Sequence, residues 1–500
     1  MVVFMDVNSN EDIPGCCDRD EKEISRVAHP FATLHRYSDD SDQIDELSFI
    51  QSSMSERDVN IHGDSSPPIF QLPPELLQQI LSYFSAQDLA RVSATCHVLA
   101  EHATNELLWS NLVNSYLPFK IHDPGPFDSF RQLYIAHHPC WFIPRNKIWF
   151  SDREHTGNLI LARYDNRRGV IEAYRIVAER RTHHFQVWNW NPDVIIQTFH
   201  PKVRLWLDDP VLLLKKDSSG SPGRPRCLNG EIRMPMALEA QNVFSSFSLC
   251  STEIPAHVAT NPTKQWPPVT IPSDRRVYRD VDDHLPEWYQ PPQRTEQISE
   301  SAFRLRKWPH FGMGVPFFST GDRETLATYA TLDPSLYTPT KEKPYQGIWV
   351  GDYSAHGCEF LLFLQRDFGE RPTSPSNSST SYQLNEPDSS EVATDEDIIH
   401  QGSLEAIKLT GDPNVPRGEI SFIAEDIGRD GMIRTADEPL FQGARIVHGR
   451  GHVAGLGFRD DTFLTSQLIL ISHDIVAHYW ESMGHVSYFR RVDIDSLIQT

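Results

Sequence analysis

Cysteine is scarce in this 500-residue sequence, and its seven copies are scattered. They are Cys16, Cys17, Cys96, Cys140, Cys227, Cys250 and Cys358. No Cys-x-x-Cys pair occurs, so the pattern indicates neither a disulfide framework nor a zinc finger. We therefore expect a reduced, intracellular protein of the cytoplasm, the nucleus or both.

Positive charge and long apolar runs are also lacking. Lys and Arg number 46 against 68 Asp and Glu, which gives a net charge of -22. General nucleic-acid binding depends on basic side chains that neutralise phosphates, so this balance argues against it. No window has the ~18 consecutive apolar residues of a membrane span, and residues 1–20 lack the order of a secretory signal. We expect neither a nucleic-acid partner nor a membrane.

The common catalytic motifs are missing as well. The sequence contains no GxSxG elbow, no GxxxxGK[ST] loop and no HExxH pair. His448 and His452 lie four residues apart, but in a strand pattern they merely share a face and no further metal ligands are evident. We expect no catalytic residue, no metal and no cofactor, and hence a chain that is not an enzyme.

Length and polar segments divide the chain. At ~150 residues per domain, 500 residues suggest about three units or fewer. Residues 1–66 hold 15 acidic and 5 basic side chains, and such a segment buries too little apolar surface to offset its ordering entropy. We predict a disordered acidic tail there, and long polar loops at 217–226 and 369–397.

A short helical module is predicted at 67–116. Pro73 and Pro74 precede an apolar stripe at Leu76, Leu77, Ile80, Leu81 and Phe84, whose spacing is helical. Ser85 and Asp88 are spaced as a capping box before a second stripe at Leu89, Val92, Cys96 and Leu99. Asn105 is placed to cap a third helix. Three helices in about 45 residues make a marginal core, so a partner that covers apolar residues is expected.

These residues resemble the F-box family. The resemblance covers Leu72-Pro73-x-Glu75-Leu76-Leu77, Ile80-Leu81, Phe84, Asp88-Leu89 and Leu108-Trp109. It implies docking on the Skp adaptor of SCF ubiquitin ligases, with the cullin and RING subunits joined through that adaptor. The adaptor contacts implied are Leu72, Pro73, Leu76, Ile80, Leu81 and Leu89. Some of these residues could instead only hold the three helices together.

The remainder, 141–500, follows a helical linker at 117–140 and has a strand-and-turn pattern. Short β-branched and aromatic runs alternate with Asp, Asn, Gly and Pro, as at 159–164 and 170–177, which the loop 165–169 joins as a hairpin. About a dozen such runs predict a closed or nearly closed antiparallel β-barrel, interrupted by a helix near 297–307. The fold class is thus α+β, a three-helix module followed by a β-barrel with long inserted loops.

Three Gly-containing turns stand out, at 351–359, 410–418 and 449–458. Glycine within strands marks a bulge, a tight bend or a close backbone approach, so barrel corners alone would explain each turn. Together they resemble the C-terminal domain of the F-box only protein 31 family. The matching residues are Gly351, Tyr353, His356, Gly357 and Glu359, then 410–414, Pro416 and Gly418, then Ala454, Gly455, Gly457 and Phe458. The resemblance implies that the barrel binds protein substrates by their C-terminal ends, the cyclin D tail among them.

Gly-rich turns supply accessible backbone N–H groups, which a terminal carboxylate requires; a terminal carboxamide also requires acceptors such as Asp. From this we predict substrate contacts at His356, Glu359, Asp412, Asn414 and Gly451. The family resembled has a Cys/His zinc site in its middle region, but no cysteine lies between Cys140 and Cys227 here, so we predict no zinc. The alternative function is a cullin-independent F-box adaptor protein in trafficking or assembly.

Overall fold

The computed structural model of the chain describes most residues from Pro68 onward. The described ranges are 68–151, 157–181, 184–215, 228, 230–236, 245–252, 291–307, 325–353, 356–367 and 399–499. The predicted acidic tail and the predicted loops at 217–226 and 369–397 lie outside them. Each described helix is too short or too polar to cross a membrane.

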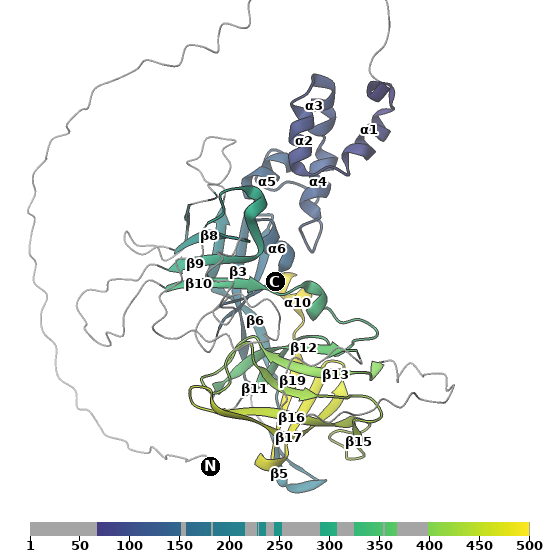
Figure 1. Cartoon of the computed structure of the whole chain (residues 1–500), viewed down its shortest axis with the longest axis vertical. Helices are drawn as coiled ribbons and strands as arrows, with labels where there is room; N and C mark the ends of the chain where they lie inside the picture. The colour runs from purple at the N-terminus through teal and green to yellow at the C-terminus, as the bar shows by residue number, and fades with distance from the viewer. Residues whose placement is uncertain are drawn as a thin grey trace, which may run out of the picture. The chain divides into compact units, whose positions relative to one another are not determined.

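The N-terminal module is built from short helices packed on one small core (Figure 1). Ser85 and Asn105 cap two of them as predicted, accepting from the backbone N–H of Asp88 and Leu107. The elements are η1 (Pro68–Gln71), α1 (Pro74–Leu81), α2 (Ala86–Ser93), α3 (His97–Ala103) and α4 (Glu106–Asn114), followed by α5 (Phe130–His137) and α6 (Phe142–Asn146). Residues of α5 complete the core, so the predicted linker at 117–140 packs as part of the module.

The second predicted helix is in fact two. Its apolar spacing continues from α2 into α3, but Cys96 between them is extended, with φ -159° and ψ 165°. The hydroxyls of Ser93 and Thr95 donate to carbonyls three residues back, at 2.8 and 2.7 Å. Such local bonds compete with the helical ladder, and they coincide with the point where α2 ends.

Residues after α6 form two sheets, not one. The first is eight-stranded, in the order β6-β3-β2-β1-β10-β9-β8-β7. Its strands are β1 (Ile148–Ser151), β2 (Leu159–Asp165), β3 (Val170–Glu179), β6 (Lys202–Lys215), β7 (Ile232–Met234), β8 (Ser245–Ser251), β9 (Ile298–Lys307) and β10 (Thr325–Thr331). The 165–169 hairpin joins β2 and β3 as predicted, with Asp165 opposite Val170.

The predicted helix near 297–307 is wrong, because these residues form strand β9 after a single 3-10 turn, η3 (Thr295–Gln297). Phe303 and Leu305 are two residues apart and both enter the core of the first sheet. Their period of two, together with pairing to β8 and β10 on either side, fixes the strand. The isolated sequence carries too few apolar residues to separate that period from a helical one.

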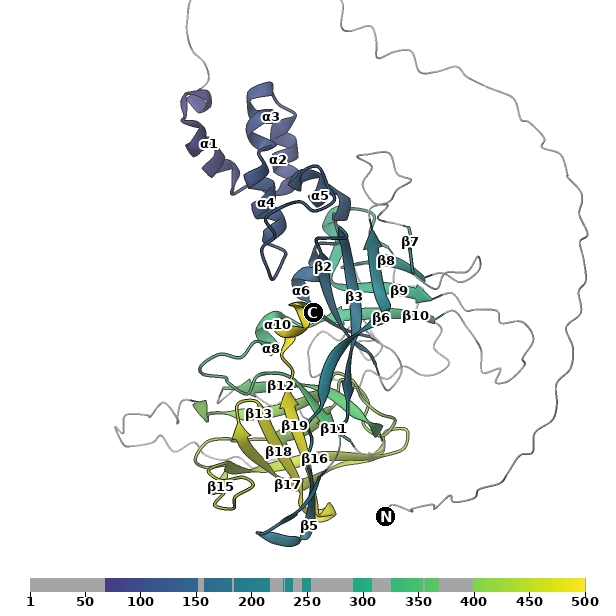
Figure 2. The same ribbon diagram turned by 180° about the vertical axis from the view of Figure 1, so that it is seen from behind.

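The second sheet closes into an eight-stranded barrel over 347–491, a shorter span than the predicted 141–500. Its order is β11-β12-β13-β14-β16-β17-β18-β19, and β19 pairs back onto β11. These strands are β11 (Gly347–Asp352), β12 (Cys358–Arg366), β13 (Ser403–Lys408), β14 (Ile420–Ala424), β16 (Arg445–Gly455), β17 (Arg459–Ser472), β18 (Ile475–Trp480) and β19 (His485–Arg491). Figure 2 shows these strands side by side in a closed ring, below the first sheet.

Additional strands and helices attach to the barrel. The hairpin β4 (Phe185–Trp188) and β5 (Asn191–Gln197) continues the sheet from the first half of β19, and β15 (Met432–Thr435) pairs with β16. Helices α8 (Pro334–Tyr337) and α10 (Ile494–Gln499) and the 3-10 turn η5 (Glu481–Met483) lie between or after strands. Side chains of the first sheet and of α10 share one core with the outer face of the barrel.

Aromatic rings fill the barrel interior. The rings of Phe422 on β14 and Phe489 on β19, two strands that are not neighbours in the sheet, have centroids 4.9 Å apart. Phe363 contacts both of them, and Trp349 stacks on Phe363 at 4.5 Å. The barrel is therefore packed rather than hollow at its middle, and any binding site in it must lie toward an end.

Candidate functional site

Helix α1 presents two different faces. Leu77 and Leu81 are buried in the core of the module, whereas Leu76 and Ile80 lie on the adjacent face and are 47% and 41% exposed. Leu72, which precedes the helix, is also exposed. A contiguous row of aliphatic side chains at the surface of a small module indicates a partner interface.

The structure divides the six predicted adaptor contacts. Leu72, Pro73, Leu76 and Ile80 lie at the surface. Leu81 and Leu89 do not, because they are only 3% and 1% exposed and pack in the core of the module. In this conformation their role is to hold the helices together, so the exposed row is reduced to four residues. We call Leu72, Pro73, Leu76 and Ile80 the α1 row.

The three predicted turns converge at one end of the barrel. The backbone N–H of Phe360, the residue directly after the first turn, donates to Thr410 Oγ1 of the second turn at 2.8 Å. Asn414 of the second turn donates from its side chain to the carbonyl of Ala454 in the third turn at 3.0 Å. Turns that are about 40 to 60 residues apart in sequence are thus joined by direct hydrogen bonds.

A buried ion cluster lies beneath these turns. The ammonium of Lys408, at the end of β13, is 2.6 Å from a carboxylate oxygen of Asp412 and 2.8 Å from one of Glu359. It also lies 4.4 Å from the ring centroid of Tyr353, within cation–π range. Lys408, Glu359 and Asp412 are all buried. We call Tyr353, Glu359, Lys408 and Asp412 the barrel-end cluster.

The two carboxyl groups of the cluster have different surroundings. Asp412 Oδ1 accepts from the backbone N–H of Asn414 and Val415, at 2.6 and 2.8 Å, and its Oδ2 accepts from Lys408. Glu359 accepts no backbone hydrogen bond in the described part of the chain, and its Oε2 shares the Lys408 ammonium with Asp412 at 2.8 Å. Asp412 is therefore the preferred site of the negative charge.

The pKa values separate accordingly. Burial raises the pKa of Glu359 to about 8, despite the opposing charge of Lys408. Burial also disfavours the charged form of Asp412, but the charge and hydrogen bond of Lys408 outweigh it and lower the pKa of Asp412 to about 2. One ammonium cannot compensate two buried carboxylates, so near neutral pH the cluster holds one ionised carboxylate, one protonated carboxyl and one ammonium.

This separation predicts a pH-dependent stability. Because the folded state raises the pKa of Glu359 from 4.5 to about 8, its contribution to stability is complete below pH 4.5 and is lost as pH rises toward 8. In chemical unfolding, the free energy of unfolding of the wild type should fall by about 3 kcal/mol between pH 5 and 8 relative to Glu359→Gln. The exposed-site control Glu425→Gln should keep the wild-type slope, and equal slopes in all three proteins would contradict the assignment.

The other predicted contacts have different surroundings. His356 is exposed at the tip of the first turn, where its backbone N–H donates to Tyr353. Asn414 is half-buried and bridges to the third turn. Gly451 faces the barrel interior, and a Cβ there would lie 2.2 Å from the ring of Trp480. The glycine is thus explained by packing, since only a residue without a side chain leaves room for that ring.

Lys408, the centre of the cluster, was missed by the sequence reasoning. The sequence does contain a clue to Lys408. It lies two residues after Ala406 and four after Leu404, so the three side chains share the interior face of a strand whose residues are all buried. A lysine on the interior face of a strand needs a charged partner, so its position predicts at least one buried acid nearby. Tyr353 lies in the first Gly-containing turn and contributes the ring that faces the Lys408 ammonium.

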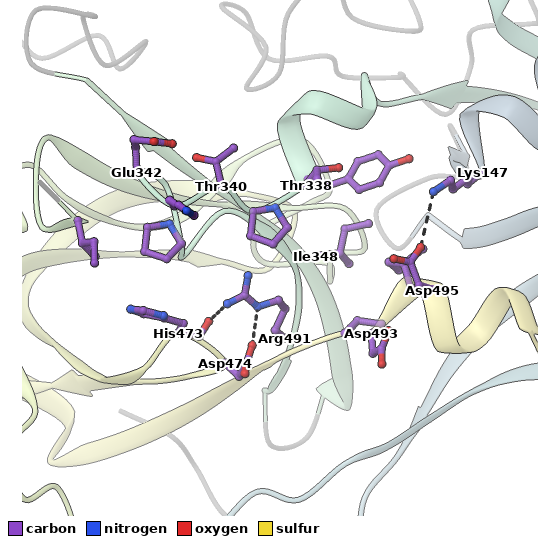
Figure 3. A pocket seen from close by; sticks show the side chains of 17 residues that line it. Lys147, Thr338, Thr340, Glu342, Ile348, His473, Asp474, Arg491, Asp493 and Asp495 are labelled. Carbon is purple, nitrogen blue, oxygen red and sulfur yellow. Dashed lines mark hydrogen bonds and ion pairs between the residues drawn. The ribbon is translucent and has the colours of Figure 1, made fainter. Parts of the chain in front are cut away.

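A cavity of about 1370 Å³ lies away from the cluster, beside the starts of β11 and α10 and the turn between β17 and β18 (Figure 3). Nothing in the sequence pattern predicted it, because its lining comes from segments more than 300 residues apart. Arg491 pairs with Asp474 at 2.8 Å and Lys147 with Asp495 at 3.6 Å, as the dashed lines show. These two cations at its wall therefore already have carboxylate partners.

Comparison with protein families matches two parts of the chain. Residues 69–115 match the model described as F-box-like, which spans η1 and helices α1 to α4. Residues 329–496 match the model described as Cyclin D1 binding domain, which spans α8, the closed barrel and the start of α10. The two matches coincide with the two regions that hold the α1 row and the barrel-end cluster.

Curated relatives are similar over a smaller share of the chain. Protein EXECUTER 2, chloroplastic, of Arabidopsis thaliana is 27% identical over 188 residues, covering 36% of this chain and 26% of the relative. Protein EXECUTER 1, chloroplastic, of the same plant is 27% identical over 173 residues, covering 32% and 22%. The rice EXECUTER 2 protein is 29% identical over 131 residues, covering 26% and 17%. The chain thus spans about a quarter or less of the length of these relatives.

Proposed function

We propose, from the premise that this chain is an F-box protein, that it is the substrate-recognition subunit of an SCF-type ubiquitin ligase. The observation that carries the proposal is the exposed α1 row on an F-box-like module, joined in one chain to a separate closed barrel. The row would bind the Skp adaptor, through which the cullin and RING subunits join. The chain itself would be a non-catalytic bridge between the adaptor and a target protein.

The target would bind at the turn-bearing end of the barrel, by its C-terminal end. Three turns meet there, and they place backbone N–H groups near a buried, internally neutralised cluster. The match to the Cyclin D1 binding domain model supports this region as the target-binding part and makes the C-terminal peptide of cyclin D1 the first probe. Asp412 would act as a positioning residue, since its carboxylate shapes the second turn through two backbone N–H groups.

The test is binding of the purified chain–adaptor complex to peptides with matched free-acid and amidated C-termini. We expect selective binding to one kind of terminus, weakened about tenfold or more by Asp412→Ala because the second turn loses the acceptor of two backbone N–H groups. Asp474→Ala, at an exposed aspartate beside the cavity, is the matched control and should bind like the wild type.

If both variants bind the adaptor with the wild-type affinity and unfold at the wild-type temperature, their fold is intact. If no peptide binds by its C-terminus, recognition of C-terminal ends is wrong, whereas the F-box assignment is unaffected. Internal segments of candidate targets would then be the next probes.

A further inference from the structure

Strand β4 is the outer strand of the second sheet. It pairs with β5, and β5 runs parallel to β19 at His485 and Val486. Among the residues that the structure describes, no strand pairs with the other edge of β4. The hairpin appears as the blue ribbon labelled β5 at the lower end of the barrel in Figures 1 and 2. Its free edge offers backbone groups to a further strand.

The side chains of this edge are apolar and exposed. Phe185 is 70% and Val187 is 61% exposed, and they are two residues apart, so they share one face of the strand. Sheet edges are usually protected by charged residues, proline or bulges. β4 contains no charged residue and no proline, and its single irregularity lies at its end, between Val187 and Trp188. The stretch from Phe185 to Val187 is therefore a regular, unprotected edge.

Positive charge gathers at the start of β4. Arg181 and His184 are exposed there, and the backbone of His184 bonds to Thr198, near the end of β5. Arg490 lies 2.9 Å from a ring nitrogen of His200. The positive charge here comes from the two arginines, because burial and neighbouring charge lower the pKa of His200 and disfavour its charged form. In a chain of net charge -22, Arg181 and Arg490 favour an acidic ligand.

The edge also lies close to the turn-bearing end of the barrel. Arg180, beside Arg181, forms an ion pair with Asp352, the last residue of β11 and the start of the first turn. The chain shortly before β4 therefore lies beside the first turn.

We propose that the free edge of β4 binds an extended segment of a target protein by strand addition. In such complexes, backbone bonds give affinity and alternate side chains give specificity. The segment would place apolar side chains at alternate positions on Phe185 and Val187 and an acidic side chain beside Arg181 and His184. That the segment belongs to a target protein rests on the proposed function. That the edge of β4 can bind an extended segment is argued from the residues of β4 alone.

The probe is a peptide with two aspartates, then alternating valine and threonine, closed head to tail through a long Gly-Ser linker. This cyclic peptide has no C-terminal end, so its binding is independent of end recognition. Fluorescence anisotropy with the full chain should show saturable binding that Phe185→Asp weakens about tenfold or more. Leu207→Asp, at an exposed leucine on the first sheet, is the control and should leave the affinity unchanged.

Charge reversal makes the test specific. Arg181→Glu should lower the affinity for the aspartate peptide and raise the affinity for a matched peptide with lysines in place of the aspartates. The proposal is overturned if neither peptide binds, or if Leu207→Asp weakens binding as much as Phe185→Asp does. It is also overturned if sedimentation reveals a dimer that Phe185→Asp dissociates, because the edge would then pair with a second copy. If the free-acid and amidated peptides show no end-selective binding while the cyclic peptide still binds, the result counts against the proposed function alone.

Discussion

Lys408→Met should destabilise the barrel by about 3–5 kcal/mol at pH 7, the largest stability effect that the structure predicts for an exchange of one side chain. Methionine has a similar length, so the loss comes from charge and not from volume. Asp412, whose pKa is held at about 2 by Lys408, would be left as a buried carboxylate with only two backbone donors. Urea unfolding at pH 7 measures the difference directly.

Two further variants make this prediction specific. Lys341→Met removes an exposed lysine at the cavity and should change the free energy of unfolding by less than about 0.5 kcal/mol. The double variant Lys408→Met, Asp412→Asn removes the stranded charge and should recover part of the loss, because neutral groups are cheaper to bury. A Lys408→Met protein within about 1 kcal/mol of the wild type would show that the cluster is not the electrostatic centre of the barrel end.

Ile80→Asp should weaken binding to the Skp adaptor by about 30-fold or more without lowering the stability of the chain. Ile80 belongs to the α1 row and is 41% exposed, so a polar residue is tolerated in the free chain but not against an apolar partner. Titration calorimetry with the purified adaptor, together with thermal unfolding, separates these two effects.

The core residue Leu81 provides the contrast. Leu81→Ala should lower stability by about 2–4 kcal/mol, because it leaves a cavity in the module, and it should weaken adaptor binding only through that loss. Leu207→Asp on the first sheet should change neither property. If Ile80→Asp and Leu207→Asp bind the adaptor equally well, the α1 row is not the interface.

Local chemistry explains what the sequence predicted well. The caps at Ser85 and Asn105 and the hairpin at 165–169 depend on residues within a few positions of one another. The helical spacing of the apolar residues from Leu76 to Leu81 predicted helix α1, although it did not separate the exposed Leu76 and Ile80 from the buried Leu81. Each of these features is decided by sequence neighbours, so inspection of one short segment is sufficient.

Non-local pairing explains the failures. The break at Cys96 depends on side-chain bonds that compete with a helix, and β9 becomes a strand because β8 and β10 flank it. The division of 141–500 into two sheets is set by which strands pair, and a strand pattern alone does not contain that information. The barrel-end cluster was half predicted, because Glu359 and Asp412 lie in recognisable turns, whereas Lys408 lies in an otherwise ordinary strand.

Closure of the barrel has a consequence for synthesis of the chain. Trp349 on β11 is paired with Arg491 on β19, so one edge of β11 has no barrel partner until about 140 further residues have been made. At ribosomal rates of about 5–20 residues per second, that interval is roughly 10 to 30 seconds. During it the nascent chain carries an open, apolar sheet edge, which chaperones or premature strand exchange between neighbouring nascent chains can reach. A stop codon anywhere within β19 would make that transient state permanent.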